Sequence, residues 1–290
     1  MSRCALCPRM CGADRAAGGV GFCGAGRAAL VCRAAPHFGE EPCLSGTRGS
    51  GAVFFAGCSL RCVYCQNHEI SRGAAGRPYT AEALRSLFLS LRDRGVHNLN
   101  LVTPTHFSAV LASALDGLEP GVPVVWNSSG YERVETLRRL EGLAQVYLPD
   151  LKYMDAALAK RYSAAPDYPE IALAAIREMY RQAGPFTLDR DGMLRSGVLI
   201  RHLVLPGAVE NTRRVIDAVE ENFPPEGVMF SLMAQYTPMP GLAAYPELCR
   251  SVSAEEYDAC RRYLARSSIV HGYVQDLSSA GTEMIPEFEL

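Results

Sequence analysis

The chain has 290 residues, of which 48% are hydrophobic and 21% charged, and its formal net charge is −2. This apolar content is ample for the core of one large domain or two ordinary ones. The near-neutral charge provides no basic field that would attract nucleic acid or an anionic membrane, so neither is expected as a partner. No run approaches the roughly 18 apolar residues that span a bilayer, and the N-terminus lacks an apolar signal region, which predicts a cytoplasmic protein.

Cysteines are concentrated at the start of the chain. There are 11 in all, which is many for a reducing compartment, where clustered cysteines more often bind metal than form disulfides. Only Cys249 and Cys260 lie beyond residue 65. The first part of the chain is also rich in glycine and arginine and has little periodicity. We therefore expect an irregular Cys-rich segment over residues 1–48, followed by a folded domain over residues 49–290.

Four of these cysteines form a pattern of their own. The stretch CALCPRMCGADRAAGGVGFC carries Cys4, Cys7, Cys11 and Cys23, with one Cys-x2-Cys knuckle. Four thiolates complete a tetrahedral zinc site, and a short glycine-rich segment with little core needs such a staple. An auxiliary iron–sulfur cluster would use the same ligands, and the cysteines could also be unliganded. The spacing leaves these alternatives open.

From Ala52 onward, short apolar runs alternate with segments of helical period, which is typical of repeated βα units with a parallel sheet. The clearest helix is 80–95, with Thr80 as its N-cap and Gly95 as its stop. The other expected helices are 106–117, 132–142, 155–183 in two pieces, and 210–222. The expected strands are 52–57, 99–103, 122–128, 144–151, 198–205 and 228–236. Six such strands favour a partial (β/α)6 TIM-like barrel over an open doubly wound sheet, although periodicity does not separate the two.

Polar side chains lie at or near the end of each expected strand. In barrels of this type the carboxyl ends of the strands carry the active site, because the loops there converge on one mouth. The residues concerned are Cys58, Thr103, Thr105, His106, Asn127, Ser128, Asp150, Lys152, Arg201, His202, Gln235 and Tyr236. The sequence therefore predicts one binding site formed by successive strand ends.

The stretch GCSLRCVYCQN places Cys58, Cys62 and Cys65 on one short loop after the first expected strand. Structural zinc takes four ligands, and no second cysteine pair follows nearby. A cubane iron–sulfur cluster has four irons, and cysteine thiolates normally take one each. Three cysteines thus leave one iron open to a substrate or cofactor. The alternatives are ordinary buried cysteines and a zinc site with a distant fourth ligand.

This stretch, with the aromatic Tyr64 before its last cysteine, resembles the cluster motif of the radical S-adenosylmethionine (SAM) enzymes. The stretches CALCPRMCG, DLKY and RHLVLPG are similar to those of uncharacterised homologues of pyruvate formate-lyase activating enzyme. The resemblance implies a partial (β/α)6 barrel and a 4Fe-4S cluster held by Cys58, Cys62 and Cys65. It also implies reductive cleavage of SAM to a 5′-deoxyadenosyl radical that abstracts hydrogen from a substrate.

The resemblance also implies a SAM pocket, in which Tyr64 lies near the adenine. Asn127 stands where the family often has an acid at the ribose, and it is followed by Ser128. An amide can still hydrogen-bond hydroxyl groups, both as acceptor and as donor. The Gly-Gly-Glu that usually receives the SAM amino group is replaced by VTPTH, where Thr103 and Thr105 offer hydroxyl or carbonyl acceptors.

Three charged residues match family positions near the methionine part of SAM. Asp150 and Lys152 belong to the DLK stretch, and Arg201 is the expected clamp for a carboxylate, which it can bind through two parallel hydrogen bonds. Lys152 and Arg201 are the expected catalytic residues. His106 is expected to be a neighbour of a helix N-cap rather than a base.

The resemblance implies an activating-enzyme-like oxidoreductase that activates a glycyl-radical enzyme or modifies a protein or peptide. A flavodoxin- or ferredoxin-type protein is the implied electron donor. Many activating enzymes carry a ferredoxin-like cysteine block after the motif, whereas HEISRGAAGRP has no cysteine. The rival interpretation is a non-catalytic interaction protein in which both cysteine groups hold zinc. Such a protein would be colourless, free of iron and without affinity for SAM.

Overall fold

The computed structural model describes residues 3–73, 76–281, 286 and 288. Within them, ten strands form one sheet in the order β10-β9-β8-β6-β5-β4-β2-β1-β3, and β7 pairs with β8 off this path. The strands are β1 (Ala29–His37), β2 (Ser50–Phe55), β3 (Arg77–Tyr79), β4 (Leu99–Val102), β5 (Val124–Ser128), β6 (Val146–Pro149), β7 (Thr187–Leu188), β8 (Leu194–Leu203), β9 (Met229–Met233) and β10 (Gly272–Val274). Because β3 and β10 end the path without pairing with each other, the sheet is not closed.

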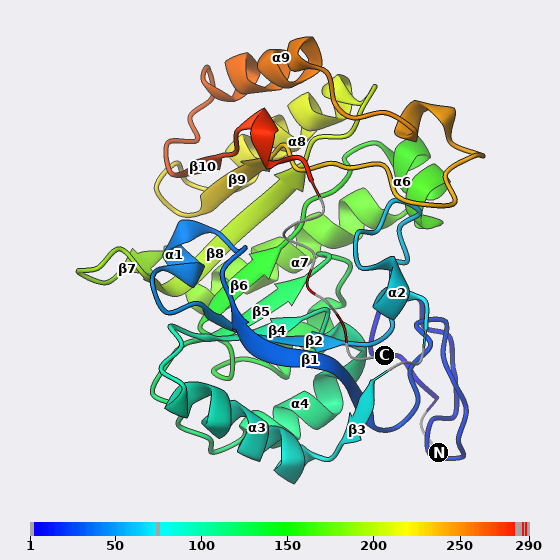
Figure 1. The fold of residues 1–290 in the computed structure, drawn as a ribbon, viewed down its shortest axis with the longest axis vertical. Helices are drawn as coiled ribbons and strands as arrows, with labels where there is room; N and C mark the ends of the chain where they lie inside the picture. The colour runs from blue at the N-terminus through cyan, green and yellow to red at the C-terminus, as the bar shows by residue number, and fades with distance from the viewer. Residues whose placement is uncertain (1–2, 74–75, 282–285, 287, 289–290) are drawn as a thin grey trace.

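Helices flank the sheet, with α3 and α4 at one end of the molecule and α8 and α9 at the other (Figure 1). The α-helices are α1 (Pro42–Ser45), α2 (His68–Ser71), α3 (Ala81–Asp93), α4 (Ser108–Leu115), α5 (Val134–Arg138), α6 (Ala156–Ser163), α7 (Tyr168–Ala183), α8 (Val209–Asn222) and α9 (Ala254–Leu264). Short 3-10 helices lie at η1 (Thr105–Phe107), η2 (Pro246–Leu248) and η3 (Leu277–Ser279). None of the helices described is long and apolar enough to cross a membrane.

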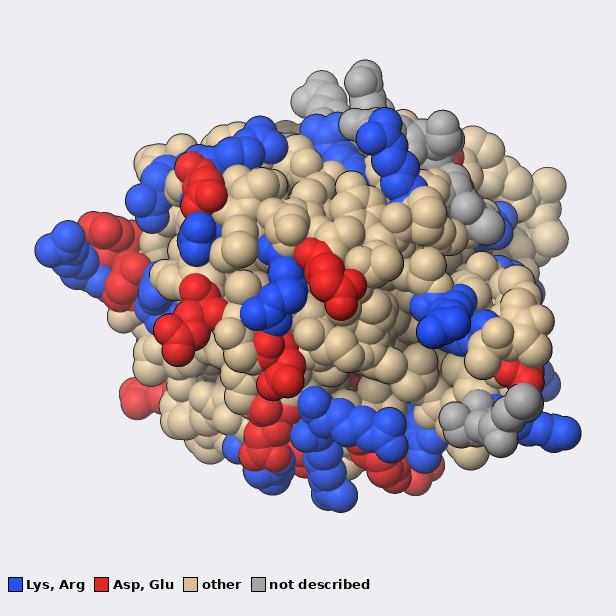
Figure 2. All heavy atoms as spheres, turned by 90° about the horizontal axis from the view of Figure 1, so that it is seen from below, with Lys and Arg blue, Asp and Glu red and all other residues tan. Residues whose placement is uncertain are grey.

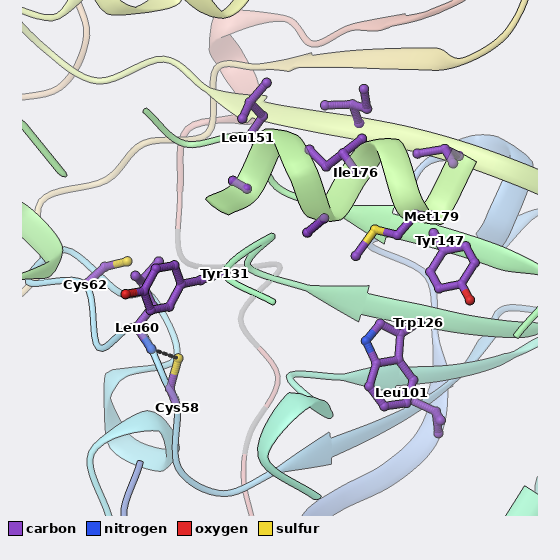
Figure 3. Packing of buried hydrophobic residues seen from close by; sticks show 14 of the residues in the cluster. Cys58, Leu60, Cys62, Leu101, Trp126, Tyr131, Tyr147, Leu151, Ile176 and Met179 are labelled. Atoms are coloured by element: carbon purple, nitrogen blue, oxygen red, sulfur yellow. Dashed lines mark hydrogen bonds between the residues drawn. The ribbon is translucent and has the colours of Figure 1, made fainter. Parts of the chain in front are cut away.

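The six expected strands are confirmed as β2, β4, β5, β6, β8 and β9. Each of them pairs in parallel with its neighbours within this set. Every residue of β4, β5 and β6 is buried, as expected for parallel strands that are covered on both faces. On the outer face, Ile176 and Met179 of α7 belong to the same buried cluster as Trp126 and Tyr147 (Figure 3). The mixed α/β fold with a parallel sheet is therefore the one predicted.

Several elements were not predicted. The longest strand among them is β1, which lies inside the segment expected to be irregular and runs antiparallel to β2, from Val31 opposite Phe55 to His37 opposite Ser50. Its residues show no clean alternation in burial, so the pairing has no period-2 signal in the sequence. Helix α9 does have a sequence signal, because Ser253 and Glu256 form a capping box. The boundary at residue 48 stays a prediction.

Charged side chains of both signs are interspersed over the surface shown in Figure 2. Their arrangement surrounds a broad area without charge and forms no continuous region of one sign on that face. This distribution matches the small formal net charge of −2.

Candidate functional site

The loop after β2 carries Cys58, Cys62 and Cys65, and its path is constrained by the N-terminal segment. The Cys58 amide donates a hydrogen bond to the Cys23 carbonyl at 3.1 Å. Gly57 has a φ of +80°, and a Cβ at this position would lie 2.3 Å from the same carbonyl oxygen. Within the loop, the Leu60 amide points to Cys58 Sγ at 3.4 Å (Figure 3). The loop therefore depends on a glycine before its first cysteine.

We expect Gly57→Ala to lower the free energy of unfolding by more than about 2 kcal/mol, because it combines a left-handed backbone with a steric clash. The matched control is Gly142→Ala, where φ is +81° and nothing lies within 4 Å of the new Cβ. The control should lose only the backbone cost of about 1–2 kcal/mol. Urea unfolding of both variants measures the difference, and equal losses would show that the Cys23 contact does not constrain the loop.

A cavity of about 300 Å³ opens beside this loop. Its lining combines the three cysteines and Tyr64 of the same loop with residues predicted at or near the strand ends, namely Thr103, Asn127, Ser128, Asp150, Lys152, Arg201 and Gln235. These side chains come from the loop after β2 and from or just after β4, β5, β6, β8 and β9. The structure therefore brings the cysteine motif and the strand-end residues to one place.

Two cations and two acids form a partly buried network on the cavity wall. Lys152 Nζ lies 2.6 Å from Asp150 Oδ2, and Arg201 Nε lies 2.9 Å from Asp150 Oδ1. Arg201 also donates to Glu40 Oε2 at 3.0 Å and to Asn127 Oδ1 at 2.7 Å. Burial alone would raise the pKa of Asp150, but Lys152 and Arg201 together bring it below its ordinary value. The carboxylate is thus ionised and holds both cations in the cavity.

Lys152 belongs to this network and also lies close enough to the cysteine loop to interact with its thiols. Burial lowers its pKa, but the Asp150 carboxylate and the neighbouring Cys62 outweigh burial and raise it overall. Burial raises the pKa of Cys65, and the ammonium group of Lys152 opposes this shift. Lys152 therefore stays charged close to the cysteine loop.

Glu40 was not predicted as a site residue, because it lies in the loop between β1 and α1 and no motif in the sequence links that loop to the sheet. Its Oε1 accepts hydrogen bonds from Asn100 at 3.0 Å and from Asn127 at 3.1 Å, and its Oε2 pairs with Arg201. The neighbouring Glu41 also lines the cavity and is 8% exposed. Glu40 thus places an acid beside Asn127, although Glu40 does not belong to β5, the strand that carries Asn127.

The VTPTH segment contributes unequally to the cavity. Thr103 lines it and has a left-handed φ of 58°. Thr105 does not line the cavity, since it is buried and its hydroxyl donates to Glu132 Oε1 at 2.6 Å. His106 is fully buried and bonds through Nε2 to the Ala56 carbonyl at 2.7 Å, while burial lowers its pKa to about 4. His106 is therefore a neutral structural residue, and Thr105 a packing residue of this turn.

Glu132 beneath this turn makes stability depend on pH. Burial raises the pKa of Glu132 to about 7, although hydrogen bonds from Thr105 and Trp126 oppose the shift. The folded protein holds the proton of Glu132 more tightly than the unfolded chain, whose pKa is about 4.5. The resulting stabilisation is complete below pH 4.5 and is lost as the pH rises to 7. The loss amounts to about 3 kcal/mol.

In the wild type, ionisation of Glu132 should lower the free energy of unfolding by about 3 kcal/mol between pH 4.5 and pH 8. We expect this decrease to be absent in Glu132→Gln. The amide keeps an acceptor for Thr105 and cannot ionise. Urea unfolding at the two pH values measures this, with Glu135→Gln as control, because that side chain is 65% exposed. Parallel pH profiles for wild type and Glu132→Gln would contradict the assignment.

The four N-terminal cysteines lie close together. Thiols of this group influence one another's pKa, and a Cβ at Gly21 would lie 3.0 Å from Cys11 Sγ and 3.5 Å from Cys23 Sγ. All 11 cysteines are free thiols. In the part of the chain that is described, no three His, Cys, Asp or Glu side chains already form the ligand set of a single metal ion. Cys11 and Cys23 thus meet at Gly21, and Cys23 contacts the loop that carries Cys58.

Comparison with known proteins adds to this geometry. An uncharacterised protein, MJ0674 of Methanocaldococcus jannaschii, is 30% identical over 234 residues. The match covers 77% of this chain and 63% of MJ0674, so the chain spans less than two thirds of that relative's length.

Two solved structures are also similar. SuiB of Streptococcus suis, bound to its precursor peptide SuiA, superposes with a TM-score of 0.53 at 12% identity, over 76% of this chain and 46% of SuiB, which shows a shared fold alone. A domain of pyruvate-formate lyase-activating enzyme from Bacteroides vulgatus gives a TM-score of 0.42 at 15% identity, over 59% of this chain and 92% of that domain. The model of the Radical SAM superfamily matches residues 52–219, which is more than half of the sequence. The chain belongs to the radical SAM superfamily.

Proposed function

We propose that this protein is an activating-enzyme-like oxidoreductase that cleaves SAM reductively and abstracts hydrogen from a protein or peptide. Members of its superfamily use a 4Fe-4S cluster and SAM. The observation that carries the proposal is the single cavity onto which Cys58, Cys62 and Cys65 open together with the Asp150 network. A zinc-binding interaction protein has no use for charged residues arranged in this way.

The donor set of the cavity fits an iron–sulfur cluster. Burial raises the pKa of Cys58 to about 12, with further contributions from Cys62 and Cys65. A Cys58 thiol buried in this way ionises only beside a strong cationic centre, which iron provides. When bound, the cluster supplies one electron that cleaves SAM into methionine and a 5′-deoxyadenosyl radical. The cysteines on the 58–65 loop are the ligands in this proposal.

The remaining wall residues bind and orient SAM. Arg201 and Lys152, held charged by Asp150, provide hydrogen-bond donors for the SAM carboxylate. Asn127 and Ser128 provide hydroxyl partners for the ribose, and Thr103 provides acceptors for the amino group. Tyr64, which is 6% exposed and lines the cavity, packs against the adenine. Together these contacts hold the reacting atoms close and exclude water.

The substrate and the electron donor are part of the proposal. SuiB is described with a bound precursor peptide, which supports a peptide or protein as the substrate of this chain also. A glycyl-radical enzyme is one such protein. A flavodoxin- or ferredoxin-type donor in the cytoplasm would deliver the electron.

Anaerobic reconstitution followed by dithionite and SAM tests the proposed function. The expected product is 5′-deoxyadenosine, detected by chromatography. With a candidate partner that carries deuterium on its backbone carbons, in ordinary water, deuterium in the deoxyadenosine would identify that partner as the hydrogen donor. Protein with an intact cluster that yields no deoxyadenosine would refute the enzyme, and a colourless protein with stoichiometric zinc would support the interaction protein.

We also propose a second metal centre, zinc or iron–sulfur, at Cys4, Cys7, Cys11 and Cys23. Its support is the clustering of the four thiols beside the cysteine loop. Replacing all four by serine should remove one zinc or the iron of a second cluster, measured per chain after anaerobic purification. Unchanged metal content in that variant would rule the second centre out.

A further inference from the structure

A chain of buried hydroxyl groups leads from Tyr64 to the sulfur of Cys62. The Tyr64 and Tyr153 hydroxyls are 2.6 Å apart, and the Tyr153 hydroxyl lies 2.9 Å from Ser163 Oγ. Ser163 Oγ is 3.1 Å from Cys62 Sγ. Tyr64, Tyr153 and Ser163 are 6%, 0% and 3% exposed, respectively. Because these groups are shielded from water, they must satisfy one another.

One direction of donation satisfies all three contacts. A ligating thiolate can only accept, so Ser163 donates its single O–H to Cys62 Sγ. Ser163 then offers only lone pairs to Tyr153, which must donate, and by the same argument Tyr64 donates to Tyr153. Burial, above all, raises the pKa of Tyr153 well above its ordinary value, so this phenol keeps its proton. Every hydroxyl in the chain therefore points toward the sulfur.

Arg9 helps to fix Ser163 relative to the cysteine loop. Arg9 Nη2 donates to the Ser163 carbonyl at 2.7 Å, and Arg9 Nη1 donates to the Ala164 carbonyl at 2.6 Å. Arg9 Nε donates to the Ser59 carbonyl at 2.9 Å. The end of α6 and the loop that carries the cysteines are thus tied together, which holds the serine in place for its bond to sulfur.

We propose that the chain Tyr64–Tyr153–Ser163 tunes the reduction potential of the centre ligated by Cys62. This inference rests on the proposed function. A hydrogen bond to a ligand sulfur stabilises the added negative charge of the reduced state. Each hydroxyl further along the chain polarises the next, so the effect on the sulfur is largest for Ser163 and smaller for each tyrosine behind it. The electron comes from the external donor, no proton leaves the chain, and the three residues are positioning residues that act through the sulfur.

A redox titration followed by electron paramagnetic resonance, without SAM, tests this inference on the reconstituted protein. Ser163→Ala should lower the equilibrium constant for reduction about tenfold, which is about 59 mV for one electron. Tyr153→Phe should give a smaller shift in the same direction, and Ser163→Thr should restore the wild-type value because it keeps the hydroxyl.

Tyr162→Phe is the matched control. Its ring also packs against Tyr64, at 6.2 Å between centroids, but its hydroxyl bonds to Glu247 at 2.8 Å, outside the chain. Its potential should not change. Flat potentials across the series, or a larger shift in Tyr153→Phe than in Ser163→Ala, would overturn this inference alone. A wild-type protein without a reducible iron–sulfur signal would overturn the proposed function, and this inference with it.

Discussion

Replacing Cys58, Cys62 and Cys65 together by serine should reduce the yield of 5′-deoxyadenosine at least roughly a thousandfold, because the variant loses the three proposed ligands of the cluster that would pass the electron to SAM. The three side chains lie on a loop at the cavity rather than in a strand, so the fold itself should persist. The measurement is product per chain after anaerobic reconstitution, with circular dichroism to confirm folding.

Cys249→Ser serves as the control, because this thiol is exposed and lies outside the cavity lining. It should retain the wild-type yield. If the triple variant kept more than about a tenth of the product while Cys249→Ser behaved as wild type, the cleavage would not depend on these three cysteines.

Replacing Arg201 by methionine should lower the free energy of unfolding by about 3–5 kcal/mol. The Arg201 side chain is 13% exposed and pairs with Asp150 and Glu40, whose side chains are 20% and 8% exposed. Its removal leaves two partly buried acids with only Lys152 to compensate them. The same variant should lose affinity for SAM, measured by equilibrium binding.

Two comparisons make the Arg201 result specific. Arg161→Met removes an arginine paired with Glu247 at the surface, where the side chains are 47% and 31% exposed, and it should cost less than about 1 kcal/mol. Adding Glu40→Gln to Arg201→Met should recover part of the loss, because one uncompensated acid is removed. Equal effects of Arg201→Met and Arg161→Met would show that the buried network does not stabilise the fold.

The parallel strands were predictable because their signal is local. A buried strand such as β6 is a continuous apolar run, VYLP, and the residues that follow it reach the active-site end of the sheet whatever their distant partners are. For this reason Asp150 and Lys152 could be placed from the sequence. The cysteine motif was predictable for the same reason, since its three members fall on one loop.

Contacts between distant segments could not be predicted. Glu40 reaches Arg201 across 161 residues, and Ser163 reaches Cys62 across 101. Neither contact has a periodic signal, because each depends on how the β1–α1 loop and the end of α6 pack. Thr105 was predicted to reach the cavity because it follows a strand end. Its hydroxyl instead donates to the buried Glu132, a contact that the sequence pattern does not indicate.

We propose that Cys58, Cys62 and Cys65 hold a 4Fe-4S cluster. The most direct test is the content of iron, sulfide and zinc per chain, measured after anaerobic purification of the wild type and of the triple serine variant. We predict that the triple variant loses about four irons and four sulfides, and that metal remaining in it belongs to the N-terminal cysteines. Equal iron in both proteins, or zinc in place of iron at these cysteines in the wild type, would contradict the claim.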